Sequence, residues 1–473
     1  MKIQPLQPAD HVSPEALREF LEQCQYVAKS DGDTRLVSIS ITVDALDPLA
    51  VLETIYEPGH PHFYAEHPSA GTAIVGAEVA AKVELQGEDR FTQLQQFADD
   101  TWAKTIAVGP VEAPFGGPHI FVAATFASAV AKADPFPAVL AFVPRWQVAR
   151  AGDVTTAVAN VPVAPEADLD ALTERLWRAH AKFGRFTFAD AAEAPSRQPQ
   201  KFTTTESFDY RESVRRGLDH IASGELEKIV LARALDVTAD SALHPLQVLD
   251  GLRQRFSECF SFSVANGRGE SFIGASPERL VRVSQGKLEA DVLAGTIRRG
   301  VGAAEDACMG KELLASTKDQ HEHAVVLNEM KRRLEGLGLT VEHPSQPSLR
   351  KLANLQHLHT PVRSELPNAI RLLDALSVLH PTPAVGGAPR VAAISAIPDI
   401  EGFSRGLYAG ALGWMNARGG GEFMVGIRSA LVRGDQARVY AGAGIVAGST
   451  PDKEFAETEF KLKALLDALQ PVR

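Results

Sequence analysis

Five segments in the second half of the chain place the strongest constraint on its fold, because each has the pattern of a β-strand. They are rich in β-branched or alternating apolar residues, and turns that contain Gly or Asn lie near them. These segments are residues 228–237, 259–266, 271–283, 421–433 and 437–446. With 45% hydrophobic residues, the chain can also bury a large core. The expected fold class is α+β with large antiparallel sheets.

Two long helices are predicted among these strands, at residues 317–338 and 451–469. The first carries apolar side chains at helical spacing, which indicates one buried face. These side chains are Val325, Val326, Met330 and Leu334.

The first half of the chain alternates β-rich runs with helical patterns, and none of them has a spacing that demands chemistry. The runs are strands at 35–43 and 138–144 and helices at 15–29 and 170–183. Residues 188–210 then lose apolar periodicity and gather Pro, Ser, Thr and Gln, as connecting segments do. We therefore expect an N-terminal scaffold half at 1–200 and a catalytic core at 205–473.

The net charge of −11 argues against attraction to nucleic acid or to anionic membranes, so an anionic substrate would need locally placed cations. The three cysteines, Cys24, Cys259 and Cys308, lack zinc-ligand spacing and favour a reducing compartment. The N-terminus has no signal-peptide core, and the longest uncharged apolar stretch, 119–131, is too short to span a bilayer. We expect a cytoplasmic protein.

The last predicted helix has the most informative polar pattern. Thr450 can cap its N-terminus, behind a Gly-rich segment. At about 100° per residue, Glu454, Glu457 and Lys461 fall within an arc of ~60°. The pattern fits a solvated helix face with a Glu457–Lys461 pair. It also fits half of a Mg²⁺ site, if a second helix supplies another carboxylate.

Glu322 is the candidate for that second carboxylate, near the start of the predicted helix 317–338. It lies between His321 and His323, and this HEH triplet lacks the HExxH spacing of zinc proteases. Taken alone, the triplet is weak evidence for a metal site.

The second half of the chain contains eight short motifs in a fixed order. They are EKIVLAR (227–233), GASPERL (274–280), LAGT (293–296), STKDQHEH (316–323), LQHLHTPV (355–362), LHPTPAVGG (379–387), GIRSA (426–430) and YAGAGIV (440–446) with the final ExxExxxK (454–461). Taken together, these motifs resemble the chorismate-binding enzymes, a family that includes isochorismate, salicylate, anthranilate and aminodeoxychorismate synthases. The resemblance is dense over 205–473 and diffuse over the first 200 residues.

The resemblance implies the fold of the anthranilate synthase large subunit. Two large antiparallel sheets would pack face to face with helices outside, and both halves of the chain would contribute. It also implies Mg²⁺ as cofactor, with Glu322 and Glu457 as direct ligands. Glu454 would be a further ligand or would hold a metal-bound water. Chorismate carries two carboxylates, so its site needs cations, backbone donors and a metal.

Further residues match substrate contacts by the same resemblance. A guanidinium fork, an ammonium group and amides at a helix entrance suit the substrate anions. The matched residues are Arg428, Lys461, Gly442, Gly444, His357, Thr296 and Tyr408. A histidine satisfied by the backbone and a tyrosine in the core are alternatives for His357 and Tyr408.

Three residues bear on which reaction the enzyme performs. Lys228 matches the position at which water-using members carry a lysine general base, whereas ammonia-using members typically carry glutamine. Glu278 matches the general acid that protonates the departing C4 hydroxyl. Ala294 stands where one branch carries a lysine nucleophile, so no covalent intermediate is expected there. The alternatives are an exposed strand-edge lysine and a glutamate paired with Arg279.

The segment PTPAVGG distinguishes isochorismate synthases from salicylate synthases, which share the base lysine. Salicylate and anthranilate synthases usually have a Ser- or Thr-bearing version, whereas Ala384 and Val385 resemble the apolar version of isochorismate synthases. A less polar wall would disfavour elimination of pyruvate. We therefore predict an isomerase, isochorismate synthase. A salicylate synthase and an anthranilate or aminodeoxychorismate synthase component are the alternatives.

The predicted partner is chorismate alone, without nucleic acid, membrane or glutaminase subunit, and a monomer is expected. The product would feed menaquinone, siderophore or salicylate biosynthesis. The extended first half favours the menaquinone type.

Overall fold

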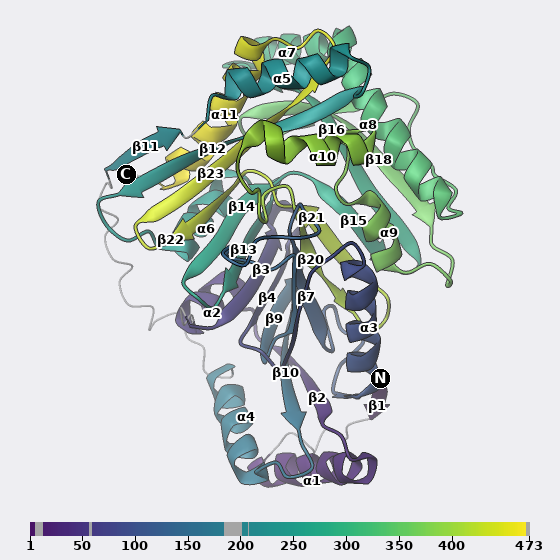
Figure 1. Cartoon of the computed structure of the whole chain (residues 1–473). Coiled ribbons are helices and arrows are strands. Elements are labelled where there is room, and N and C mark those ends of the chain that lie inside the picture. Colours follow the sequence, from purple (N-terminus) through teal and green to yellow (C-terminus); the bar gives the residue numbers. More distant parts are fainter. Residues whose placement is uncertain (5–12, 56–58, 184–200, 207, 470–473) are drawn as a thin grey trace.

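The structure is a computed structural model, and it describes residues 1–4, 13–55, 59–183, 201–206 and 208–469. The expected connecting segment at 188–210 lies largely outside these residues. In the described part, the strands form two large sheets (Figure 1).

The first sheet has 14 strands, which come from both halves of the chain. They are β1 (Lys2–Gln4), β2 (Arg35–Val43), β3 (Pro61–His67), β4 (Thr72–Ala77), β6 (Thr105–Val108), β9 (Trp146–Ala151), β10 (Val154–Val163), β11 (Phe202–Glu206), β12 (Lys228–Ala239), β13 (Phe260–Asn266), β14 (Glu270–Ser276), β19 (Gly387–Ala388), β22 (Ser429–Arg433) and β23 (Gln436–Val446). Their order is β1-β6-β2-β10-β9-β4-β3-β13-β14-β22-β23-β12-β11, with β19 also paired to β12. β6 pairs in parallel with β1 and β2.

The second sheet has nine strands, and it too combines both halves of the chain. They are β5 (Ala81–Leu85), β7 (His119–Ala124), β8 (Val139–Val143), β15 (Arg279–Ser284), β16 (Lys287–Arg298), β17 (Ser348–Lys351), β18 (Leu355–Glu365), β20 (Ala411–Asn416) and β21 (Gly421–Val425). Their order is β17-β18-β16-β15-β21-β20-β7-β8-β5, and the neighbours are antiparallel.

The two sheets pack face to face over a large apolar core. Phe63 on β3 and Phe121 on β7 are fully buried, and their rings stack across the sheets with centroids 4.8 Å apart. The predicted α+β class with two large, packed sheets is confirmed. The parallel pairs of β6 make the first sheet mixed rather than wholly antiparallel.

The helices lie outside the sheets (Figure 1). They are α1 (Pro14–Asp31), α2 (Pro48–Ile55), α3 (Arg90–Ala103), α4 (Leu169–Phe183), α5 (Tyr210–Ala222), α6 (Pro245–Arg255), α7 (Ala303–Ala315), α8 (Thr317–Gly336), α9 (Leu372–Leu379), α10 (Arg390–Glu401) and α11 (Pro451–Leu469). The two predicted long helices are confirmed as α8 and α11, and α8 ends two residues earlier than predicted. Within the described residues, no helix has both the length and the apolarity needed to cross a bilayer.

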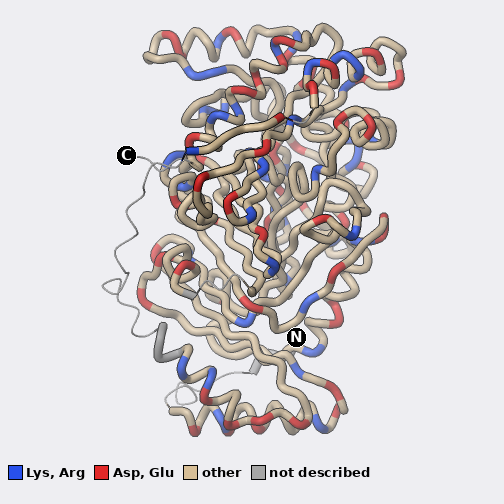
Figure 2. Tube along the Cα trace, turned by 60° about the vertical axis from the view of Figure 1, so that its left-hand side comes forward, with Lys and Arg blue, Asp and Glu red and all other residues tan. Residues whose placement is uncertain are grey.

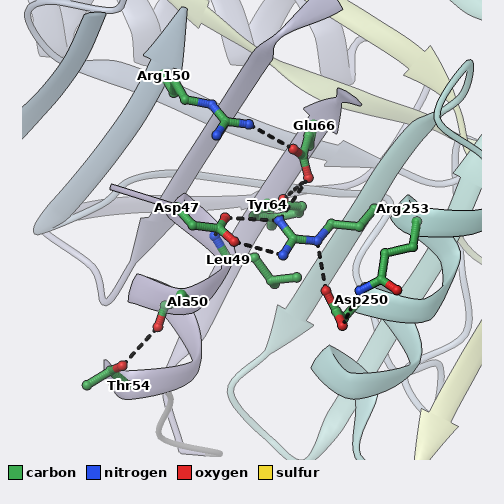
Figure 3. Close-up of polar contacts among 10 residues, drawn as sticks. Asp47, Leu49, Ala50, Thr54, Tyr64, Glu66, Arg150, Asp250 and Arg253 are labelled. Carbon is green, nitrogen blue, oxygen red and sulfur yellow. Dashed lines mark hydrogen bonds and ion pairs between the residues drawn. The ribbon is translucent and has the colours of Figure 1, made fainter. Parts of the chain in front are cut away.

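A polar network ties the first half of the chain to α6 (Figure 3). The Arg253 guanidinium donates to both carboxylate oxygens of Asp47, at 2.9 and 2.7 Å, and to Glu66 on β3 at 3.4 Å. Arg150 on β9 donates to Glu66 from the other side, at 3.2 Å. Because Glu66 is almost fully buried, the loss of these arginines would leave an uncompensated charge in the interior.

Two predicted strands, 271–283 and 421–433, each consist of two strands in different sheets. The first splits at Pro277–Glu278, between β14 and β15. The second splits at residues 426–428, between β21 and β22. The prediction of single strands was wrong, because the apolar alternation continues through both crossings.

The two segments at which the chain passes from one sheet to the other, residues 277–278 and 426–428, lie side by side. Each of these sheet crossings carries a predicted site residue. The Val425 N–H donates to the Glu278 carbonyl, and the Ala275 N–H donates to the Arg428 carbonyl, each at 3.1 Å. Arg428 has a φ of +49°, a left-handed conformation that is uncommon for a residue with a side chain. The fold thus places a candidate acid and a candidate anion-binding group at the points where the chain changes sheet.

Candidate active site

A cleft opens between the sheets beside these crossings, and most of the predicted site residues line it. These residues are Glu278, Thr296, Glu322, His357, Ala384, Tyr408, Arg428, Gly442, Gly444, Glu457 and Lys461. Ala294 and Val385 also line the cleft, and all of its described lining residues lie at or after Val230. Lys228 and Glu454 are not among the lining residues. They are buried and make ion pairs with neighbouring side chains.

Lys228 is the first residue of β12, where it lies opposite Val446 on β23. Its side chain is 1% exposed, and its Nζ donates to Glu322 Oε1 at 2.9 Å. Lys228 is therefore not the exposed strand-edge lysine that was the alternative prediction. The approach requires glycine at position 444, because a Cβ there would lie 2.2 Å from Glu322 Oε1.

Glu322 lies in the second turn of α8, which Ser316 caps by accepting a hydrogen bond from the Asp319 N–H at 3.3 Å. Burial raises the pKa of Glu322, but the neighbouring lysines outweigh burial and hold this pKa below its usual value. The carboxylate is therefore charged at neutral pH. Lysines 228, 318 and 461 supply the compensating charge.

Each of the three carboxylates predicted to hold a metal is paired with a different lysine. Lys228 contacts Glu322 at 2.9 Å, Lys318 contacts Glu454 at 2.8 Å, and Lys461 contacts Glu457 at 2.7 Å. The Glu457–Lys461 pair is the intrahelical pair that the spacing on the last helix allowed. The three pairs place carboxylates from α8 and α11 beside an equal number of ammonium groups.

Lys318 received no role from the sequence, although it lies inside the motif STKDQHEH. Its position one turn before Glu322 was the available signal, because residues four apart share a helix face. Its partner, Glu454, is 2% exposed. Burial and the nearby Glu457 raise the pKa of Glu454, whereas Lys318 opposes this shift.

Glu278 is buried at the first sheet crossing, directly after Pro277. Burial, together with the charge of Asp291, raises its pKa to about 8, although Lys228 acts in the opposite direction. Its Oε1 has no hydrogen-bond partner among the described residues. A carboxyl group with these properties is mostly protonated at neutral pH and can donate a proton to a ligand in the cleft.

Arg428, His357 and Thr296 form a short chain of hydrogen bonds. The Arg428 guanidinium lies 2.7 Å from His357 Nε2, and His357 Nδ1 lies 3.0 Å from the Thr296 hydroxyl. Since arginine is always a donor, Nε2 must accept, and Nδ1 carries the proton. Burial and Arg428 hold the pKa of His357 well below its usual value, so the imidazole is neutral. One guanidinium nitrogen, NH1, is buried and has no hydrogen-bond partner among the described residues.

The position of Thr296 opposite His357 depends on a β-bulge at Gly295, whose φ is +77°. The pairing of β16 with β18 shifts between Ala294 and Thr296, which places Thr296 opposite His357. A glycine suits this position because other residues rarely adopt such a φ.

The remaining wall is largely apolar and aromatic. Tyr408 stacks on Tyr440 with ring centroids 5.0 Å apart, and both line the cleft. Sequence reasoning missed Tyr440, although it is the first residue of the motif YAGAGIV. Lys461 Nζ donates to the Gly442 carbonyl at 2.8 Å, which fixes the ammonium beside the Gly-rich strand.

The carboxylate oxygens of α8 and α11 are the type of donor that a hard divalent cation prefers. No group of three or more His, Cys, Asp or Glu side chains in the described part of the chain is arranged to hold a metal ion. Mg²⁺, however, commonly takes only one or two carboxylates and fills its other positions with water and substrate oxygens. Glu322 and Glu457 line one cleft and suit that mode of binding.

These features together define a class of protein: an enzyme that binds a small anionic substrate between two packed sheets. Lys and Arg are interspersed with Asp and Glu along the outer helices (Figure 2), so the cations of the cleft itself must hold such a substrate. The family model of the chorismate binding enzymes matches residues 19–470. The chain belongs to this family.

Relatives align over nearly the whole chain. The salicylate biosynthesis isochorismate synthase of Pseudomonas aeruginosa is 34% identical, over 97% of this chain and 95% of its own length. Isochorismate synthase MenF of Bacillus subtilis is 31% identical, over 93% of this chain and 95% of its own length. The structure of the menaquinone-specific isochorismate synthase MenF from Escherichia coli superposes with a TM-score of 0.76. It is 25% identical, and the match covers 95% of this chain and all of that one.

Proposed function

We propose that this protein is an isochorismate synthase, which converts chorismate into isochorismate. The observation that carries the proposal is a buried acid in the cleft, Glu278, whose pKa is raised to about 8, together with a buried lysine, Lys228, that contacts the cleft residue Glu322. The reaction needs a group of each kind, because water attacks ring C2 while the C4 hydroxyl departs. The names of the two relatives with 34% and 31% identity support the same activity.

In the proposed mechanism, Lys228 must be in its neutral form when water attacks, so that it can accept a proton from that water, and Glu278 gives its proton to the departing hydroxyl. One water is consumed and one is released, so the reaction is a net isomerisation. Ala294 offers no nucleophile at its position, and the mechanism has no covalent enzyme intermediate.

Substrate binding is assigned to the cations and amides of the cleft. Arg428 would bind a substrate carboxylate through its unpartnered NH1, and the His357–Thr296 chain would hold the guanidinium in orientation. Lys461 and the amides near Gly442 and Gly444 would contact the remaining anionic groups. Tyr408 would pack against the substrate.

Mg²⁺ is part of the proposal. Glu322 and Glu457 would hold it, and Glu454 would be a further ligand or would hold a metal-bound water. When bound, the ion supplies positive charge that stabilises the ring carboxylate. Each of these three carboxylates also contacts a lysine, at 2.7 to 2.9 Å.

Chromatography of the products formed from chorismate and Mg²⁺ tests the proposal. Isochorismate alone is the expected product, with or without ammonium. Salicylate together with pyruvate would make the protein a salicylate synthase. Fluorescent anthranilate, formed only with ammonium, would identify an amine-transferring enzyme and overturn both the reaction and the expectation that no glutaminase is needed.

The menaquinone pathway is a finer prediction. The Escherichia coli relative is menaquinone-specific, whereas the Pseudomonas aeruginosa relative serves salicylate biosynthesis, and both align over nearly the full chain. The identity of the neighbouring genes would distinguish the pathways.

A further inference from the structure

Arg405, between α10 and β20, is a fully enclosed arginine outside the set of residues assigned above. Its side chain is 3% exposed, and its guanidinium makes hydrogen bonds in three directions. NH1 donates to the Val385 carbonyl at 2.8 Å, and NH2 donates to the Val230 carbonyl at 2.7 Å. Nε donates to Glu401 Oε2 at 2.9 Å.

Glu401, the last residue of α10, completes this arrangement. Its side chain is fully buried, and its Oε1 accepts the Ala232 N–H at 2.6 Å as well as a hydrogen bond from Arg405 NH2. The Phe126 ring lies against the guanidinium, 4.3 Å from its centre. A buried pair that is satisfied in this way adds little net stability over an apolar substitute, so its value lies in fixing geometry.

The groups that Arg405 and Glu401 join belong to different walls of the cleft. Val385 belongs to the apolar wall, and Val230 and Ala232 belong to β12, the strand that begins with Lys228. The same two segments also contact each other, because the Val230 N–H donates to the Gly386 carbonyl at 2.8 Å. The ion pair and this direct pairing together hold the apolar wall against the strand of the proposed base.

We propose that Arg405 and Glu401 are positioning residues that set the Ala384–Val385 wall against β12 and thereby keep isochorismate as the final product. The inference rests on the proposed function. In the competing reaction, the bond between ring C3 and the side-chain oxygen breaks, and the hydrogen on C2 moves to the side-chain methylene carbon. Pyruvate and aromatic salicylate result without any co-reactant.

The guanidinium is needed for its shape as well as for its charge. A lysine at position 405 would keep the positive charge but could not donate to two carbonyls and a carboxylate from one planar fork. Displacements of about 1 Å in a site can cost ~100-fold in rate, so a relaxed wall should affect turnover more than binding.

The test compares Arg405→Lys with a matched control, Arg333→Lys. Arg333 is also a mostly buried arginine paired with a glutamate of its own chain segment, Glu329, at 2.9 Å. It donates to the Pro381 carbonyl at 2.9 Å, upstream of the wall, and none of its hydrogen bonds within the described residues goes to β12. Both variants are purified as full chains and checked for folding by circular dichroism and thermal melting. Their kcat, KM and product ratios with chorismate are then compared with those of the wild type.

For Arg405→Lys we expect kcat to fall about 10- to 100-fold with KM changed less than about threefold, and salicylate with pyruvate to appear among the products. For Arg333→Lys we expect the wild-type product ratio. A folded Arg405→Lys variant with wild-type kcat and product ratio would overturn the inference, as would the same change in both variants.

Two further variants keep the inference testable if Arg405→Lys does not fold. Glu401→Gln retains the arginine but removes its counter-charge, and Phe126→Leu removes only the ring beside the guanidinium. Each should shift kcat and the product ratio in the same direction, and a folded variant that shifts neither counts against the inference. If the wild type forms a product other than isochorismate, the proposed function fails. The positioning role is still decided by comparing each variant's products with those of the wild type.

Discussion

Lys228 Nζ lies 2.9 Å from Glu322 Oε1, so the proposed base and a proposed metal ligand form one buried ion pair. Removing either partner leaves the other as an uncompensated buried charge, which is strongly destabilising in proteins. The two roles must therefore be separated by measurements that report on each of them independently of folding.

Replacing Lys228 by Met should remove the base and reduce turnover of chorismate by about 100- to 10,000-fold. The comparison variant is Glu322→Gln, which should weaken Mg²⁺ binding in calorimetry, whereas Lys228→Met should not weaken it. Turnover is measured on protein whose folding has been verified. Wild-type turnover in a folded Lys228→Met variant would exclude Lys228 as the base.

Replacing Lys318 by Met should strengthen Mg²⁺ binding in the absence of substrate. The Lys318 ammonium lies 2.8 Å from the Glu454 carboxylate, where it would repel a bound cation. Removing a repulsion of this kind is worth at least about 1 kcal/mol, which corresponds to roughly fivefold in affinity. Isothermal titration with Mg²⁺ alone provides the measurement. Lys463→Met, which removes an exposed lysine of the same helix α11, is the control and should leave the affinity unchanged. Equal effects of both substitutions would contradict the prediction.

Glu278 should make stability depend on pH in a definite direction. Its pKa is raised to about 8 in the folded chain from an ordinary value of 4.5, so the folded chain holds an additional proton between these values. The contribution of Glu278 to stability should therefore fall as pH rises from about 5 to about 8. Chemical denaturation across this range should show that the stability of the wild type falls relative to that of Glu278→Gln as pH rises. Turnover should decline as pH rises through about 8, because the acid loses its proton. Parallel pH profiles of stability for the two proteins would count against the raised pKa.

Arg428→Lys should raise KM for chorismate by about 10- to 100-fold, since a hydrogen bond between charged groups is worth about 1.5–3 kcal/mol and lysine cannot reproduce the fork. Steady-state kinetics measure the effect. The matched control is Arg433→Lys on the neighbouring strand β22, whose side chain is 60% exposed. A KM for Arg428→Lys that equals that of the control would remove Arg428 from the binding site.

Ala384→Thr should place a hydroxyl in the apolar wall and let part of the isochorismate lose its side chain. We expect the variant to form salicylate and an equal amount of pyruvate. Chromatography detects the salicylate, and a coupled assay detects the pyruvate. Ala353→Thr, outside the cleft, serves as the control. If the Ala384→Thr variant forms isochorismate alone at wild-type rates, the polarity of this wall does not control the product.

The two long helices, α8 and α11, were predictable from the sequence because their signals are local. Pro451 and the apolar spacing after it define α11, and the Ser316 cap defines the start of α8. Membership of a strand in one sheet or the other was not predictable at Glu278 and Arg428, because period-two alternation is the same in both sheets. The motifs pointed to the groups that face the cleft. Lys318 was missed because its partner, Glu454, lies on another helix. Arg405 was missed because the two carbonyls that it binds, those of Val230 and Val385, come from distant segments, although Glu401 is only four residues away.

The interleaving of the two halves has a practical consequence. β13 pairs with β3 and β20 pairs with β7, so each sheet is crossed by strands that come from opposite ends of the chain. A fragment that begins at residue 205 would retain the cleft residues but would expose two bare strand edges, one in the middle of each sheet. Exposed edges of this kind invite pairing with other chains. We expect such a fragment to aggregate, and the catalytic half to be producible only together with the strands that complete its sheets.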